Sequence, residues 1–95
     1  MARYILLSTL TERGRETIKS KPERIKEVNL EVGDYGVKVL EQYAVLGPYD
    51  FVTIVDAPDD EAIFKMSVDL GSRGTIKIMS MSAITIDELI ETLKG

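Results

Sequence analysis

Four short runs of β-branched, aromatic and aliphatic residues recur along the chain and limit what it can fold into. They are Arg3 to Leu10, Val37 to Leu46, Phe51 to Asp56 and Thr75 to Met81. Each run is short for a helix, so each predicts a strand. Segments with helical periodicity separate the first run from the second and the third from the fourth. The chain should therefore alternate strands and helices in a fixed order.

The first helical segment begins after Thr11, which can act as its N-cap. Pro22 interrupts the segment, because proline clashes with the preceding helical turn but suits the first turn of a new helix. We therefore expect a kink or break near residue 20 and a restart with a Ser20…Glu23 capping box. Gly36 should end the segment as a left-handed cap.

The second helical segment follows Pro58, with Asp59 as the residue that can accept from its first free amides. Its predicted buried stripe is Ala62, Ile63, Met66 and Leu70, and Gly71 should close it. A short third helix, Ile86 to Leu93, is predicted from a Thr85…Glu88 capping box.

The resulting order is β-α-β-β-α-β followed by a terminal helix. This order predicts a ferredoxin-like α+β sandwich, with strand order 4-1-3-2 and two helices on one face of an antiparallel sheet. With 95 residues, the chain has room for a single domain over residues 1–95.

The face of the sheet that the helices leave bare is predicted to be apolar. Whichever alternate set faces the helices, the opposite set in strands two to four still contains large apolar side chains. Such a face tends to be covered in a soluble protein. We therefore expect a homodimer or higher homo-oligomer formed through the sheet face, with a two-fold dimer as the simplest closed arrangement.

Several function classes are excluded by what the chain lacks. It contains no cysteine and no histidine, so there is no disulfide, Ser-His-Asp triad or usual zinc ligand. Its formal charge of −4 opposes binding to nucleic acid. No apolar segment approaches the ~20 residues that span a bilayer. We expect a cytoplasmic protein with no cofactor, no metal, no nucleic-acid partner and no membrane contact.

The turn between the second and third strands, Gly47-Pro48-Tyr49-Asp50, is the main candidate site. A phenol beside a carboxylate can bind a polar ligand, or act as acid and base if burial shifts the two pKa values. The alternative is structural: Asp50 bonds backbone amides in the turn and Tyr49 covers the edge of the core. Residue types alone favour the structural alternative.

Two other clusters have simpler explanations. Asp56, Asp59, Asp60 and Glu61 could attract a hard cation, but helix capping and dipole compensation account for them. The Gly71–Gly74 loop, which includes Arg73, could bind an anion, but it follows a helix and so lies at the unfavourable dipole end.

The chain as a whole resembles the GYD domain family, named for a Gly-Tyr-Asp signature. The signature stands here as Gly47-Pro48-Tyr49-Asp50, and the similarity extends over RYILLSTLTERGRETIK, PERIKEV, VLEQYAVLGPYDFVTIVDAPDD and LGSRGTIK. The resemblance implies a ferredoxin-like fold, a function that is unassigned in most members, and kinship with dimeric α/β-barrel proteins. Oxygenases and haem proteins of that wider group commonly use histidine or tryptophan, and this chain has neither.

The function predicted from the sequence is an oligomeric small-molecule-binding protein, with a pocket near the hairpin and the sheet face. Its ligand-binding residues would be Tyr49, Asp50, Tyr43 and Tyr4. Two alternatives stay open. One is a cofactor-independent enzyme that uses Asp50 as base and Tyr49 as donor, and the other is a purely structural oligomerising module.

Overall fold

The computed structural model describes all of residues 1–95 and contains one four-stranded sheet. The elements, in chain order, are β1 (Ala2–Leu10), α1 (Glu12–Ser20), α2 (Arg24–Glu31), the 3₁₀-helix η1 (Val32–Tyr35), β2 (Lys38–Ala44), β3 (Phe51–Ala57), α3 (Asp60–Ser72), β4 (Ile76–Ala83) and α4 (Ile86–Lys94). Every strand and helix predicted from the sequence is present, and the ends differ by a few residues at most.

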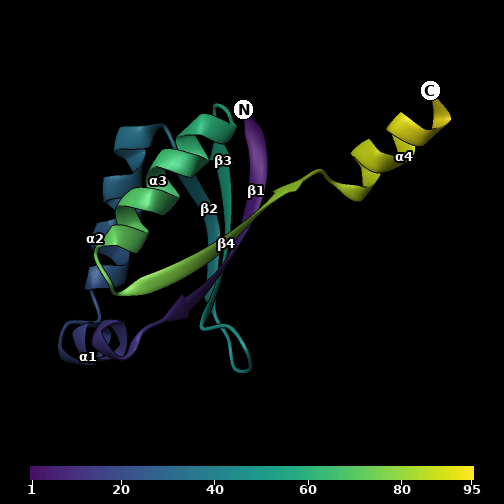
Figure 1. Cartoon of the computed structure of the whole chain (residues 1–95). Helices are drawn as coiled ribbons and strands as arrows, with labels where there is room; N and C mark the ends of the chain where they lie inside the picture. The colour runs from purple at the N-terminus through teal and green to yellow at the C-terminus, as the bar shows by residue number, and fades with distance from the viewer.

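The sheet is antiparallel throughout, with β1 and β3 in its middle and β4 and β2 at its edges. The order β2-β3-β1-β4 is the predicted 4-1-3-2, counted from the other edge. Figure 1 shows α2 and α3 on one side of the sheet, which we call the covered face. The hydrophobic core lies between this face and the helices, where Val55 of β3 and Met66 of α3 are each 1% exposed.

The opposite side, the open face, has no helix over it in Figure 1. Because Tyr4, Leu6 and Ser8 of β1 are buried on the covered face, the alternate residues of β1 and their partners point the other way. We define the open face by six large apolar residues: Ile5, Leu7, Val52, Ile54, Met79 and Met81. The centre of this face is therefore apolar, as predicted, while Arg3, Glu41 and Lys77 lie on the same face around it.

The helical segment after β1 breaks at Pro22 as predicted, since α1 ends before it and α2 begins after it. Gly36 ends η1 with φ 78°, the predicted left-handed cap. The predicted Ser20…Glu23 capping box is wrong, because Glu23 makes no side-chain capping bond and the Ser20 hydroxyl donates to the Glu16 carbonyl oxygen at 3.1 Å. Glu23 already has helical angles (φ −63°, ψ −14°), so no extended N-cap exists there.

In α3 the predicted N-cap is confirmed, since Asp59 Oδ1 accepts from the Ala62 amide at 2.9 Å. The predicted stripe of Ala62, Ile63, Met66 and Leu70 is buried. Gly71 does not close the helix, which continues to Ser72. The left-handed glycine after the helix is Gly74 (φ 76°), three residues later.

Helix α4 lies away from the rest of the molecule (Figure 1). Its predicted start is confirmed, because Thr85 Oγ1 accepts from the Glu88 amide at 3.1 Å and donates to Glu88 Oε1 at 3.2 Å. We call its aliphatic residues Ile86, Leu89, Ile90 and Leu93 the α4 stripe, and they are 40–77% exposed. No residue of α4 is buried, so its own chain leaves this stripe uncovered.

Candidate functional site

Tyr4 lies on the covered face of β1 and is 4% exposed. Its hydroxyl donates to Asp60 Oδ1 in the first turn of α3. This hydrogen bond, with burial and the neighbouring negative charge, raises the pKa of Tyr4 to about 12. At neutral pH Tyr4 therefore acts as a donor that ties β1 to α3.

Asp50 ties the hairpin to the end of β1. Its Oδ2 accepts from the Leu10 amide at 2.7 Å, and its own amide donates to the Ser8 carbonyl oxygen at 2.8 Å. Its carbonyl oxygen accepts from the Val45 amide at 2.9 Å. The carboxylate thus bonds a backbone amide, as the structural alternative predicted, although that amide belongs to β1. Tyr49 lies beside it and is partly buried.

Tyr43 lies on the other side of the sheet from Tyr4 and is 55% exposed. Its hydroxyl donates to Glu41 Oε2 at 2.7 Å, and this bond raises the pKa of Tyr43. Along β3, Tyr43 pairs with Val52 and Tyr4 with Val55. The four predicted ligand-binding residues therefore do not line one pocket within a single chain, and their role in binding stays a prediction.

The acidic residues at the end of β3 are engaged in separate structural contacts. Asp56 Oδ1 lies 3.4 Å from Arg3 Nε, Asp59 caps α3, and Asp60 accepts from Tyr4. No three acidic side chains in the chain come together in a group that could hold a metal ion.

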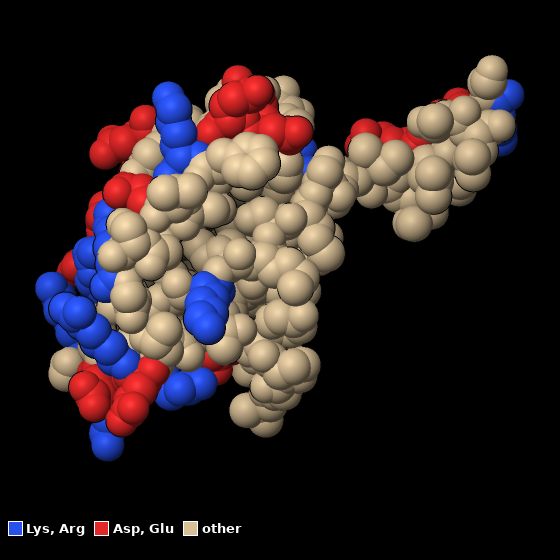
Figure 2. Space-filling model, viewed as in Figure 1, with Lys and Arg blue, Asp and Glu red and all other residues tan.

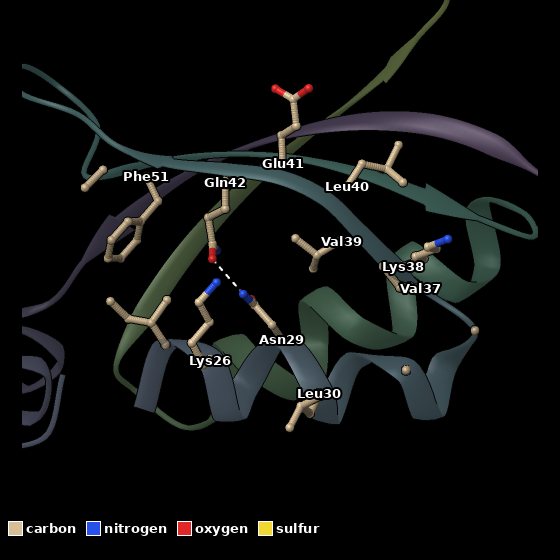
Figure 3. Close-up of a pocket in the computed structure, with 14 residues that line it drawn as sticks. Lys26, Asn29, Leu30, Val37, Lys38, Val39, Leu40, Glu41, Gln42 and Phe51 are labelled. Carbon is tan, nitrogen blue, oxygen red and sulfur yellow. Dashed lines mark hydrogen bonds between the residues drawn. The ribbon is translucent and has the colours of Figure 1, made fainter. Parts of the chain in front are cut away.

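A groove of about 880 Å³ runs between α2 and β2 (Figure 3). Asn29 of α2 and Gln42 of β2 point toward each other across it, and Asn29 Nδ2 donates to Gln42 Oε1 at 2.7 Å. Gln42 Nε2 in turn donates to Thr53 Oγ1 of β3 at 3.1 Å, and Thr53 is 5% exposed. These three residues form a polar chain from the groove into the covered face.

Sequence reasoning missed Gln42 as a covered-face residue because β2 contains a bulge. The pairing register shifts between Val39 and Glu41, so Val39 and Gln42 share one face although they are three residues apart. Strict alternation along β2 would place Gln42 on the same face as Lys38 and opposite Val39. Figure 3 shows Val39 and Gln42 directed toward α2 and Glu41 directed away from it. No local pattern marks the bulge.

Charge is unevenly distributed over the surface. Figure 2 shows acidic and basic side chains gathered around α1 and α2 and at the start of α3, whereas the surface over β4 is mostly uncharged. The uncharged surface continues onto one side of α4. Exposed large apolar side chains include Met79 and Met81 of the open face, Phe64 and Val68 of α3, and the α4 stripe.

No helix of the chain is both long enough and apolar enough to cross a membrane. Two solved structures share the fold. MtbAldR superimposes with a TM-score of 0.65 at 22% identity over 88% of this chain and 52% of its own, so the chain spans about half of MtbAldR. TTHA0845 from Thermus thermophilus superimposes with a TM-score of 0.56 at 21% identity, over 90% of this chain and 95% of its own.

One relative of similar length is named for the proteins that it binds. The glutamine synthetase and cystathionine beta-lyase binding protein of Thermus thermophilus is 52% identical over 95 residues, covering 99% of this chain and 100% of that protein. The GYD domain matches residues 4–93, which include all but the first residues of β1 and nearly all of α4. The chain therefore belongs to the GYD domain family.

Proposed function

We propose that this protein is a binding protein whose partner is another protein, in the first instance a metabolic enzyme such as glutamine synthetase or cystathionine β-lyase. The observation that carries the proposal is the relative named for binding both enzymes, which is 52% identical from end to end. The match extends over the full length, so it includes every element of the fold, α4 among them. The chain also has an exposed segment of the kind that proteins use for recognition.

That segment is α4. Its stripe residues stand at positions i, i+3, i+4 and i+7, the spacing of anchors with which amphipathic helices enter apolar grooves. An isolated helix of nine residues is marginal in water, so α4 gains stability when its stripe is covered. We infer that the α4 stripe is the surface that contacts the partner enzyme.

The open face serves a different contact, with a second copy of this chain. We infer that the fold is the ferredoxin-like sandwich and that two sheets pair face to face in a two-fold dimer. Met79 and Met81 at the β4 edge are 51% and 40% exposed, so they would be covered on pairing. Partner binding through α4 and pairing through the open face use separate residues, and variants can separate them.

The small-molecule and enzymatic functions predicted from the sequence gain less support. Asp50 already accepts the Leu10 amide at 2.7 Å, which disfavours it as a general base. A small-molecule ligand bound near the hairpin and the sheet face by Tyr49, Asp50, Tyr43 and Tyr4 stays a prediction, as does a cytoplasmic location.

The proposal is tested by titrating the purified protein into glutamine synthetase and cystathionine β-lyase from its own organism, with calorimetry as the readout. Ile90→Glu places a charge in the α4 stripe and should weaken binding about tenfold or more. Glu91→Gln changes the next residue, on the polar side of the same helix, and should bind as the wild type does.

The oligomeric state of both variants, measured by sedimentation, distinguishes partner binding through the α4 stripe from self-association through the open face. If α4 contacts the enzyme, Ile90→Glu keeps the oligomeric state of the wild type. Failure of the wild type to bind either enzyme would overturn the proposal, and dissociation of Ile90→Glu into monomers would assign α4 to self-association instead.

A further inference from the structure

A cavity of about 310 Å³ lies on the covered face, between the sheet and the ends of α1, α2 and α3. Three arginines line it: Arg13 of α1, Arg24 of α2 and Arg73 after α3. No aspartate or glutamate is among its 16 lining residues. The chain as a whole has a formal charge of −4, whereas the only ionisable side chains that line this cavity are basic. The lining therefore differs in sign from the rest of the chain.

The arginines keep free donors. Glu31 holds two of them at the rim, with Oε2 at 2.7 Å from Arg24 Nη1 and Oε1 at 2.9 Å from Arg73 Nη1. Desolvation alone would raise the pKa of Glu31, but Arg73 and Arg24 outweigh it and lower that pKa, so Glu31 is a stable anion. Arg24 Nη1 also lies 3.3 Å from Glu27 Oε1, and Arg73 Nη2 lies 3.7 Å from Asp69 Oδ2. Each guanidinium has five N–H donors, so these contacts still leave donors unused on both side chains. Arg13 takes part in no ion pair.

The remaining lining is part polar and part aliphatic. Ser8, which is 5% exposed, lies on the sheet side, and Asn29 and Gln42 contribute the polar chain described above. Seven lining residues are hydrophobic, among them Ile18 and Phe51. The volume is at the lower end of the range for small-molecule sites, about 300 to 1,000 Å³. A matching occupant has a small anionic head and a short hydrocarbon portion.

The cavity can be reached from outside. It shares Ile25, Asn29, Gln42 and Phe51 with the groove of Figure 3, so the two hollows adjoin along the Asn29–Gln42 hydrogen bond. Both amide side chains sit where a ligand would pass from the groove into the cavity.

We propose that this arginine-lined cavity binds a small organic carboxylate with an aliphatic chain, with the arginines contacting the carboxylate and the hydrophobic wall contacting the chain. The site lies on the opposite side of the sheet from the open face and is separate from α4. It therefore does not depend on the proposed protein partner.

The test uses hexanoate as the probe, with hexanol, acetate and hexyl phosphate for comparison, and follows backbone amide shifts of the full-length protein by NMR. Hexanoate should bind saturably and shift Ser8, Gly14 and Phe51, while hexanol and acetate bind more weakly because each lacks one half of the recognised chemistry. Arg13→Gln should weaken hexanoate about fivefold, since it removes a partly screened charge contact.

Arg15→Gln is the matched control, because Arg15 is an exposed arginine of the same helix that does not line the cavity. Its affinity for hexanoate should equal that of the wild type. The proposal would be overturned if both variants lost affinity for hexanoate equally, or if hexanol bound as tightly as hexanoate. It would also be overturned if the protein preferred hexyl phosphate, or if the amide shifts were confined to residues outside the cavity.

Discussion

Three of the four tyrosines act in the same way, as hydroxyl donors to carboxylates. Tyr4 donates to Asp60, Tyr35 to Asp69 and Tyr43 to Glu41. In each case the acceptor's charge stabilises the neutral phenol, and the pKa of the tyrosine is raised. These residues therefore join elements of the fold, or neighbouring positions on one strand, rather than supply a proton acceptor.

A dependence of stability on alkaline pH follows from Tyr4. Its pKa is about 12 in the folded chain against 10.0 for an ordinary tyrosine, so the folded state binds more protons than the unfolded state between these values. The contribution of Tyr4 is complete below pH 10.0 and is lost as the pH rises toward about 12. Urea unfolding across this range should show a smaller loss of stability in Tyr4→Phe than in the wild type. Tyr49→Phe serves as the control and should follow the wild type; an unchanged slope in Tyr4→Phe would contradict the assignment.

Among the elements, α1 depends on one close approach to the start of β4. Thr11 donates its amide to the Thr75 carbonyl oxygen at 3.0 Å and its hydroxyl to the Gly74 carbonyl oxygen at 2.8 Å. Gly14 lies over the same backbone, and a Cβ there would stand 2.0 Å from Thr75 O. Only glycine allows α1 to pack at this distance, and this packing forms one wall of the arginine-lined cavity.

Gly14→Ala is therefore expected to destabilise the fold by about 1–3 kcal/mol, because backbone must move to relieve the overlap. Gly71→Ala is the matched change in α3, where an added Cβ meets nothing within 4 Å. It should stabilise the chain by about 0.5–1 kcal/mol, the usual gain from replacing glycine inside a helix. Thermal unfolding of the two variants measures both effects, and equal stabilities would refute the close-packing argument.

In the whole molecule, the β4 edge of the open face and the α4 stripe leave large apolar side chains exposed. With extents of 51 × 29 × 19 Å, the chain is elongated because α4 extends beyond the sheet. Exposed apolar surface of this kind tends to be covered by a partner, so we expect the chain to assemble with a second copy.

We expect the wild type to sediment as a dimer, at twice 10.6 kDa, at micromolar concentration. Met81→Glu, on the open face, should dissociate it by placing an unpaired charge between the two sheets. Leu46→Glu adds the same charge in the hairpin turn, where Leu46 is fully exposed, and should leave the dimer intact. A wild type that sediments as a monomer would rule out pairing through the open face.

Several features could be predicted because each depends on residues that are neighbours in the chain. They are the order of elements, the break at Pro22 and the helix caps at Thr11, Asp59 and Thr85. The buried stripe of α3 could be predicted for the same reason, since helical periodicity repeats within one element.

What sequence reasoning could not find depends on contacts between distant segments. The bulge that turns Gln42 to the covered face is set by pairing with β3, and Asp50 meets an amide 40 residues away. Arg13, Arg24 and Arg73 become neighbours of one cavity only because the sheet register and the packing of three helices bring them together. Local sequence thus determined which elements form and where they begin. Tertiary packing decided which side chains share a site, because a shared site depends on the distances between strands and helices. Residues that are adjacent in the chain do not specify those distances.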